Sequence, residues 1–303
     1  MKRSIVSGIC IMILLSVSLF AVKIGFIATN FSSEAQARVA NQFASICEER
    51  GWELVQLNSM GSIETQSTQL ENLVTMKVDA IILAMAHPNE VKSSLEKAFE
   101  AGIPVITVDS GYVDGVVTDI TSDNFVIGAK MSTYLTDSLG GTGNIVVIKF
   151  QKHYGARRRG KVLDVVLSEY PGIKVLDEYS VAATQRFMDD TRSAMETFAL
   201  KYGDQIDGVW CAFDQLAYAV ADVLEEYGLS DVLVVAADGN EETFKRIKRG
   251  NMTATVAQPF EDMARIAADI VQKIVDGMDP AEAAGKQIYY AEAQLIDRTN
   301  VPE

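Results

Sequence analysis

Short apolar runs rich in β-branched residues alternate with amphipathic stretches along the whole chain after Val22. This pattern is typical of a parallel β-sheet with helices on both faces, because the crossover helices bury both sides of such a sheet. In the first half it predicts strands over Ile24–Ala28, Leu54–Asn58, Ala80–Ala84 and Val105–Asp109, with helices near Ser33–Arg50, Ile63–Met76 and Asn89–Ala101.

The second half repeats the alternation, and no segment rich in Pro, Gly and Ser separates the two halves. A chain of 303 residues also exceeds the usual size of one domain, so we expect an α/β protein of two similar domains, with one large domain as the alternative. The predicted strands are Asn144–Phe150, Lys174–Ser180, Gly208–Ala212, Val232–Ala237 and Thr253–Ala257, and the helices lie near Ala156–Glu169, Asp190–Tyr202, Gln215–Tyr227 and Glu241–Arg249.

The first 21 residues have the features of a secretory signal peptide. Lys2 and Arg3 precede an apolar stretch from Ile5 to Leu19, and the segment ends in Ser-Leu-Phe-Ala. We therefore expect cleavage after Ala21 and a periplasmic or otherwise extracytoplasmic protein. The apolar stretch approaches the length of a membrane-spanning helix, so an uncleaved anchor is the alternative.

The chain is strongly acidic, with 27 Lys and Arg against 41 Asp and Glu and a formal net charge of −14. Such a surface excludes binding to the phosphate backbone of nucleic acids, which requires clustered basic residues. Cys47 and Cys211 lie in apolar patterns and are expected to be buried without a disulfide bond. With His87 and His153 far apart and no Cys-x-x-Cys motif, neither a metal site nor a cofactor is expected.

Polar residues follow the predicted strands at their carboxyl ends, where open α/β sheets bind ligands. Hydroxyl, amide and carboxylate groups in this position suit a ligand covered in hydroxyls, because each hydroxyl both donates and accepts a hydrogen bond. The alternative is helix capping, which is the preferred interpretation for Ser59 and Asn89. The residues at strand ends are Thr29, Asn30, Asn58, Ser59, His87, Asp109, Ser110, Asp214, Asp238 and Gln258.

Asp109 and Asp238 are the strongest candidates, because each ends a strand that should be fully buried, where an ionised carboxylate needs partners. The three consecutive arginines from Arg157 to Arg159 offer a guanidinium that matches a pair of hydroxyls. Neighbouring helical positions point about 100° apart, so at least one of the three faces solvent. Arg157 lies nearest the preceding loop and is the one expected to face the ligand.

Recognisable catalytic motifs are absent from the sequence. There is no Gly-x-Ser-x-Gly nucleophile motif, no phosphate-binding Gly-x-x-x-x-Gly-Lys-Ser/Thr loop and no glycine-rich dinucleotide fingerprint after the first strand. We therefore expect a binding protein and not an enzyme. The rival hypothesis is an enzyme that uses the same cleft, with Asp109, Asp214 or His153 as acid or base.

Six segments, in this order and spacing, resemble the type I periplasmic sugar-binding proteins, and the ribose-binding branch in particular. The resemblance covers essentially the whole chain after the leader. The segments are Ala101-Gly-Ile-Pro-Val-Ile-Thr-Val-Asp109, Thr121-Ser-Asp-Asn124 followed by Gly128, Ala156-Arg-Arg-Arg-Gly160, Gly208-Val-Trp-Cys-Ala-Phe-Asp214, Ala237-Asp-Gly239 and Ala254-Thr-Val-Ala-Gln258.

The resemblance implies two Rossmann-like lobes with parallel sheets, joined by a hinge of three crossover segments. These crossovers would fall near residues 122/123, 258/259 and 292/293, so that each lobe draws on both halves of the chain. The N-terminal lobe would comprise residues 22–122 and 259–291, and the C-terminal lobe residues 123–258 and 292–303. This corrects the simpler division into two consecutive halves.

The resemblance also implies which residues contact the ligand. Asp109, Asp238, Arg157 and Gln258 match positions that bind sugar hydroxyls in the family, and Thr29 and Ser33 match contributors from the first loop. The family's aromatic pair in that loop is replaced by Ser33-Glu34-Ala35-Gln36, with Phe31 as a substitute or a packed loop residue. The full set of expected ligand contacts is Thr29, Asn30, Ser33, Asp109, Ser110, Arg157, Arg186, Phe213, Asp214, Asp238 and Gln258.

Further departures separate the chain from ribose binding. Ser110 and Phe213 replace an Arg and an Asn of the family, and the aromatic residue before a helix of the second lobe falls near Arg186 or Phe187. Loss of the aromatic pair together with Arg186 favours a smaller, acyclic or oxidised ligand such as a polyol.

The implied function is capture of a sugar or polyol by hinge closure and delivery to the permease of an ABC transporter, by a protein expected to be a monomer. A chemoreceptor is a second possible partner, and a sensing receptor for an autoinducer-like molecule is an alternative function. The related lactose-repressor family adds an N-terminal DNA-reading helix pair, but here an export signal occupies that place.

Overall fold

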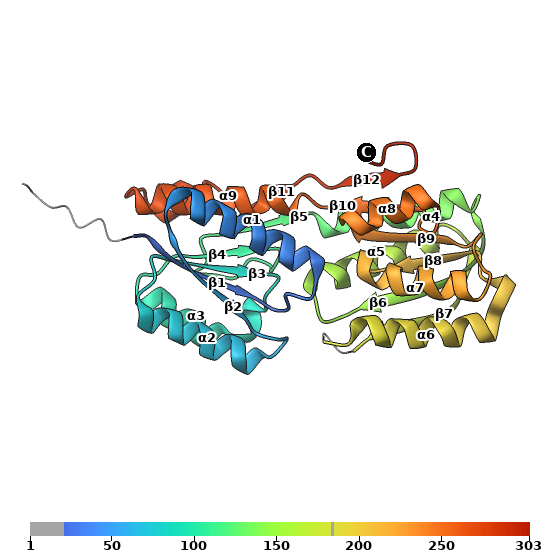
Figure 1. Cartoon of the computed structure of the whole chain (residues 1–303), viewed down its shortest axis with the longest axis horizontal. Helices are drawn as coiled ribbons and strands as arrows, with labels where there is room; N and C mark the ends of the chain where they lie inside the picture. Colours follow the sequence, from blue (N-terminus) through green and yellow to red (C-terminus); the bar gives the residue numbers. More distant parts are fainter. Residues whose placement is uncertain (1–20, 183–184) are drawn as a thin grey trace, which may run out of the picture.

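The computed structural model describes residues 21–182 and 185–303, so the predicted signal peptide lies outside the described residues except for Ala21. Two six-stranded sheets, each flanked by helices, form two lobes that lie side by side along the long axis of the molecule (Figure 1). The α/β class, the two lobes and the predominantly parallel sheets are confirmed.

The first lobe is built on a sheet in the order β11-β5-β4-β3-β1-β2, and every neighbouring pair in it is parallel. Five of the strands come from the beginning of the chain and one from near its end. They are β1 (Lys23–Ala28), β2 (Glu53–Asn58), β3 (Ala80–Ala84), β4 (Val105–Val108), β5 (Thr118–Ser122) and β11 (Ile288–Ala291).

Side chains of β1 alternate between two apolar layers, which explains why its sequence is apolar throughout. Phe26 packs in the layer formed with α1 and α9, and Ile27 packs in the layer formed with α2 and α3. The sheet is therefore buried on both faces, under helices α1 (Glu34–Arg50), α9 (Phe260–Val275) and α10 (Pro280–Ala284) on one side and α2 (Ile63–Met76), the short η1 (Pro88–Glu90) and α3 (Lys92–Glu100) on the other.

The second lobe repeats this architecture on a sheet in the order β12-β10-β9-β8-β6-β7, in which only β12 runs antiparallel to its neighbour. Its strands are β6 (Thr142–Phe150), β7 (Gly172–Val181), β8 (Gly208–Cys211), β9 (Leu233–Asp238), β10 (Ala254–Ala257) and β12 (Gln294–Asp297). Its helices are α4 (Asn124–Ser138), α5 (Tyr154–Ser168), α6 (Phe187–Tyr202), the short η2 (Gly203–Gln205), α7 (Asp214–Glu226) and α8 (Glu241–Arg249).

The chain passes between the two sheets three times, after β5, after β10 and after β11. Successive strands β5 and β6 belong to different sheets, as do β10 and β11, and β11 and β12. Each lobe consequently contains segments from both ends of the chain, which Figure 1 shows as red elements beside blue ones in the first lobe. These passages bring the carboxyl ends of both sets of parallel strands to the space between the lobes.

Two local predictions were wrong. Ser62, not Ser59, caps α2, since its hydroxyl accepts a hydrogen bond from Thr65 N, and Asn89 lies inside η1 and does not cap α3.

The two described cysteines, Cys47 and Cys211, are buried and free, as predicted. Within the described ranges, no helix is long and apolar enough to cross a membrane.

Candidate functional site: the pocket between the lobes

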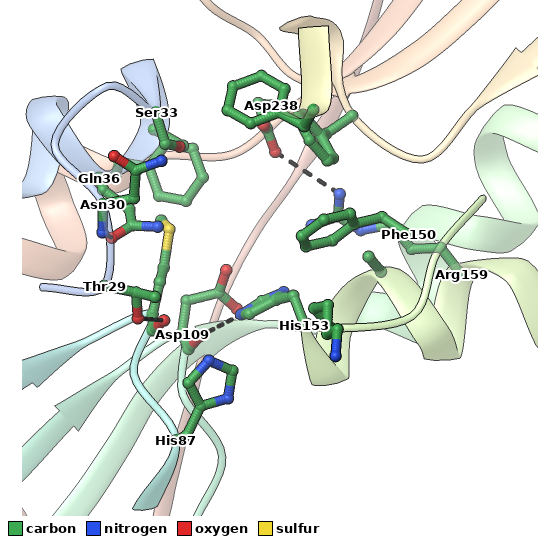
Figure 2. Close-up of a pocket in the computed structure, with 17 residues that line it drawn as sticks. Thr29, Asn30, Ser33, Gln36, His87, Asp109, Phe150, His153, Arg159 and Asp238 are labelled. Atoms are coloured by element: carbon green, nitrogen blue, oxygen red, sulfur yellow. Dashed lines mark hydrogen bonds and ion pairs between the residues drawn. The ribbon is translucent and has the colours of Figure 1, made fainter. Parts of the chain in front are cut away.

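A pocket lies between the lobes at the carboxyl ends of their strands and is lined from both sides (Figure 2). We call it the central pocket. The first lobe contributes the loop after β1 and the residues that follow β3 and β4, and the second contributes the loop after β6, the first turns of α5 and the end of β9. Six of the expected residues line it: Thr29, Asn30, Ser33, Asp109, Phe213 and Asp238.

Backbone strain is concentrated at this pocket. Met60, Lys77, Met85, Asp109 and Asp238 are the residues other than glycine that have positive φ within the described part of the chain, and the last three line the pocket. The φ of Asp109 is 47° and that of Asp238 is 137°. Such conformations cost about 1–3 kcal/mol each and gather at ligand sites, where they aim a side chain that regular geometry would not. The strain therefore supports a binding role for both aspartates.

Asp109 presents a partly occupied carboxylate from the first lobe. It is 1% exposed, and its Oδ1 accepts hydrogen bonds from Thr121 Oγ1 at 2.8 Å and from Asn124 Nδ2 at 3.4 Å. No other side chain in residues 21–182 and 185–303 donates to the carboxylate of Asp109, so Oδ2 is available to a ligand. A carboxylate held at one oxygen in this way is oriented in advance to accept a bond from a hydroxyl.

Asp238 presents the matching group from the second lobe. Its Oδ1 accepts a hydrogen bond from Gln258 Nε2 at 3.0 Å and lies 3.6 Å from Nη1 of Arg159. Burial raises the pKa of Asp238 to about 7; Arg159 opposes this rise and Asp214 adds to it. Near neutral pH the side chain of Asp238 therefore exchanges between two forms. The protonated carboxyl can both donate and accept hydrogen bonds, and the ionised carboxylate can only accept them. Gln258 does not line the pocket and positions Asp238 instead.

The arginine of the pocket is Arg159, which corrects the expectation for Arg157. Arg159 is 2% exposed, and its guanidinium donates to Asn124 Oδ1 at 2.8 Å and to the carbonyl of Ala212 at 2.9 Å. Arg157 is exposed outside the central pocket, where Nη1 donates to the carbonyl of Gln151 at 2.9 Å. The two positions lie about 200° apart around α5, so only one of them can face the pocket.

An aromatic cluster of Phe150, Phe187 and Phe213 forms the second-lobe wall of the pocket. The rings of Phe150 and Phe187 each meet that of Phe213 edge-on, with centroids 5.4 and 5.5 Å apart respectively. Arg186, expected at this wall, is exposed outside the pocket near Asp189. The wall offers an apolar surface to the C–H faces of a sugar or polyol, so aromatic residues of the second lobe line the pocket although Phe31 of the first loop does not.

Two further expected residues act inside the fold and not in the pocket. Ser110 accepts from the backbone N–H of Ala86 at 2.9 Å, and its hydroxyl approaches backbone carbonyls, so it fixes the loops after β3 and β4. Asp214 is fully buried and accepts hydrogen bonds from Thr243, Thr255 and the backbone of Asn240. Asp214 thereby anchors the loop that carries Asp238.

The two histidines of the described chain both line the pocket, one from each lobe. His153 Nε2 lies 2.8 Å from the backbone carbonyl of Asp109, which can only accept, so Nε2 carries the proton. Burial lowers the pKa of His153, and burial likewise lowers the pKa of His87. His153 thus joins the lobes as a neutral donor, a role that its position in the sequence did not predict.

Gln36 organises the first loop. Its Oε1 accepts a hydrogen bond from the backbone N–H of Asn30 at 2.7 Å. Asn30 Oδ1 in turn accepts from Ser32, which completes a rigid turn ahead of α1. The sequence analysis named His87, His153 and Phe187 without including them among the expected ligand contacts. The other lining residues outside that set are Ala35, Gln36, Met85, Phe150, Lys152, Ala156, Arg159 and Phe260.

The family model for the periplasmic binding protein domain matches residues 24–279, which cover most of the chain and both lobes. The chain belongs to this family. It is therefore a member of a family of binding proteins, and the pocket between its lobes is at the place where both sheets present their carboxyl ends. The resemblance found in the sequence is confirmed.

Individual relatives agree with this assignment. The chain is 31% identical over 229 residues to the xylitol-binding protein of Mycolicibacterium smegmatis, a match that covers 75% of this chain and 65% of that protein. It is 29% identical over 247 residues to the D-allose-binding periplasmic protein of Escherichia coli, covering 76% and 74% of the two chains. The fold matches a solute-binding protein from Agrobacterium vitis solved with allitol, with a TM-score of 0.83, 23% identity and coverage of 94% and 98%.

Clusters of three or more His, Cys, Asp or Glu side chains suitable for a metal ion are not found among the described residues. Asp109 and Asp238 lie in separate lobes and are each held by hydrogen-bond donors. The lining of the pocket offers hydrogen-bonding groups and aromatic rings to a ligand.

Proposed function

We propose that the protein binds a monosaccharide, a polyol or a related hydroxyl-rich molecule in the central pocket and delivers it to an ABC transporter. The observation that carries this proposal is the pair of strained, buried aspartates, Asp109 and Asp238, which present carboxyl oxygens from opposite lobes. The aromatic cluster adds an apolar wall. The xylitol-binding and D-allose-binding relatives support this ligand class.

Binding would couple to closure of the lobes, because one ligand contacts both aspartates only when the lobes are close together. We propose that the two moving bodies are residues 22–122 with 259–291 and residues 123–258 with 292–303. Direct interlobe hydrogen bonds support a closed state that is accessible to this chain: Gln215 Oε1 accepts from Glu34 N at 2.9 Å, and Tyr218 OH donates to Glu34 Oε2 at 3.2 Å.

In this proposal the ligand leaves the pocket chemically unchanged. Asp109 and Asp238 each have hydrogen-bond partners that account for their burial, and His153 is engaged with a backbone carbonyl. The segment of residues 1–21 would direct export and then be removed, so the mature protein would work outside the cytoplasm. We propose that it acts there as a monomer beside its permease.

Calorimetric titration against a panel of pentoses, hexoses and their polyols tests the proposal, together with small-angle scattering of the protein with and without the ligand found. We expect a ligand with a dissociation constant of about 1 µM or lower, a decrease in the radius of gyration on binding, and recovery of the unmodified ligand by mass spectrometry. Binding that is unchanged in both Asp109→Ala and Asp238→Ala would overturn the assignment of the pocket.

A further inference from the structure

A second hollow opens from the central pocket between the same two lobes. The two share His87 and Lys152 in their linings, so they lie next to each other. Beyond these two residues, the hollow is lined by Gln151 and Arg157 from the second lobe and by Glu90 from the first, among others. We call it the adjoining hollow. A ligand extended from the central pocket would reach it directly.

Two cationic side chains of the adjoining hollow lack an acidic partner. Within the described ranges Lys152 forms no hydrogen bond or ion pair, and Arg157 bonds only to the carbonyl of Gln151. Some other cations of the described chain are paired, such as Arg38 with Glu261 and Arg246 with Asp222, whereas others, such as Lys161 and Lys174, form no ion pair. Among the unpaired cations of the described chain, Lys152 and Arg157 are distinguished by their position, because both line a hollow beside the ligand pocket.

The first turn of α5 adds to the positive potential there. This helix is 15 residues long, and its N-cap residue, His153, makes no side-chain capping hydrogen bond because its ring reaches to Asp109 instead. Ala156 in that turn lines the central pocket, and Arg157 lines the adjoining hollow. The N-terminus of a helix favours an anion, through its free N–H groups and its dipole.

The lowered pKa of His87 is consistent with a positive electrostatic potential in the adjoining hollow. Burial is the main cause that lowers its pKa; Glu90 opposes this decrease, and the positive charges of Arg157 and Lys152 add to it. Glu90 is the acid of the hollow, and its Oε1 lies 3.9 Å from Nδ1 of His87. It therefore sits toward His87 on the first-lobe side, whereas Lys152 and Arg157 belong to the second lobe.

We propose that the adjoining hollow is an anion subsite, in which the side chains of Lys152 and Arg157 bind a carboxylate or phosphate carried by the ligand. This inference rests on the proposed function, because the hydroxyl-bearing part of the same ligand lies between Asp109 and Asp238. The ligand class is then a sugar acid or a sugar or polyol phosphate. Both have the terminal oxyanion that these cations recognise.

Matched ligand pairs test the proposal by calorimetry with the full mature chain. Each pair joins a neutral tetrose, pentose or hexose derivative to its anionic counterpart: xylitol with xylonate, ribitol with ribitol 5-phosphate, and allose with allonate, for example. We expect the anionic member to bind about tenfold more tightly, and the preference to shrink as salt rises. Comparing the sugar-acid pairs with the phosphate pair shows whether the hollow prefers a carboxylate or a phosphate.

Three single substitutions locate the effect. Arg157→Gln should weaken binding of the anionic member by about tenfold and leave binding of the neutral member unchanged. Lys152 also lines the central pocket, so Lys152→Gln should weaken binding of the anionic member more than that of the neutral member. Lys161→Gln is the matched control, because Lys161 is exposed one turn further along α5 and lies outside both linings. It should change neither affinity.

Different results of these titrations test the anion subsite and the proposed function separately. Equal or tighter binding of the neutral member overturns the anion subsite and leaves the sugar- or polyol-binding function intact. A preference for the anion that survives both substitutions also overturns it, since the charge is then recognised elsewhere. Failure of every member of every pair to bind counts against the proposed function itself.

Discussion

Nη1 of Arg159 lies 3.6 Å from Oδ1 of Asp238, and both side chains are almost fully buried, at 2% and 6% exposed respectively. The arginine comes from the second turn of α5 and the aspartate from the end of β9, so the pair connects two elements of the second lobe at the pocket. A buried ion pair of this kind contributes orientation more than net stability, but removing one partner leaves a costly unpaired charge.

Arg159→Gln is expected to abolish ligand binding, with a loss of at least about 100-fold, and to destabilise the folded protein by about 3 kcal/mol. Its guanidinium also donates to Asn124 and to the carbonyl of Ala212, and glutamine cannot reach all three partners. Titration calorimetry and urea unfolding measure the two effects. Lys161→Gln removes a charge from the exposed side of the same helix and should change neither value. Wild-type affinity in Arg159→Gln would contradict its placement in the site.

The pH dependence of stability should carry the signature of Asp238. Its pKa is raised to about 7 by burial, whereas an aspartate in the unfolded chain titrates near about 4. Between these values folding takes up a proton, so the free energy of unfolding contributed by this group falls as pH rises, by up to about 1.4 kcal/mol per unit. Asp119, with a pKa raised to about 6 by burial, acts in the same direction.

Asp238→Asn should remove the larger of these two contributions, because the amide does not titrate. Urea unfolding of the ligand-free protein at intervals from pH 4.5 to pH 8 measures the slope, and the difference between wild type and variant cancels the other carboxyl groups. Asparagine has almost the same size and shape as aspartate, so the substitution changes the charge with the least disturbance of the backbone at this position. Parallel stability profiles for the two proteins would mean that Asp238 is ionised throughout.

The sequence interpretation located strand-end residues well and helix-facing residues poorly. Asp109 and Asp238 were identifiable because each follows an apolar run, and the end of a parallel strand has one place in the fold. To identify Arg159 as the arginine of the pocket, one must know which side of α5 faces the pocket. That side depends on where the helix begins, which is Tyr154 and not near Ala156. A signal was present, since Ala156, Arg159, Gly160 and Leu163 are buried at helical spacing.

Other parts of the site and fold needed information that a linear pattern lacks. Phe150 ends a predicted strand and Phe187 starts a helix, but apolar residues at such places usually belong to the core, and only the folded chain shows that they meet at a pocket. Likewise β11 pairs with β5 although 165 residues separate Ser122 from Ile288. The crossovers were expected only from the family resemblance.

Phe213 is the centre of the aromatic cluster, so Phe213→Leu tests whether the rings contact the ligand. Leucine keeps most of the apolar volume but loses the aromatic face, and we expect affinity to fall about three- to tenfold with little change in stability. Phe31→Leu is the matched control, because Phe31 packs against the first-lobe core and lies outside the pocket lining. Calorimetry measures both. An equal loss in the two variants would show that the cluster acts through folding and not through contact with ligand.

Arg38 links the lobes without lying in the central pocket. Its guanidinium forms a two-point ion pair with Glu261, at 2.8 Å for both bonds. Nη1 also donates to the carbonyls of Asp238 and Gly239 at 3.1 Å and to Asn240 Oδ1 at 3.2 Å. A helix of the first lobe is thus tied to the loop of the second lobe that carries a ligand-facing aspartate.

Arg38→Gln should shift the population toward the open state and weaken ligand binding about tenfold, because only the closed fraction binds with full affinity. Small-angle scattering of the ligand-free variant should give a larger radius of gyration than wild type, and saturating ligand should restore the same compact value. Arg265→Gln is the control, since Arg265 bonds to Asp262 on the surface of α9 within one lobe. Gln215→Ala removes separate interlobe bonds to Ser32 and Glu34 and should act in the same direction. Lower stability of Arg38→Gln with an unchanged dissociation constant and radius would assign Arg38 to folding alone, because closure would then not depend on it.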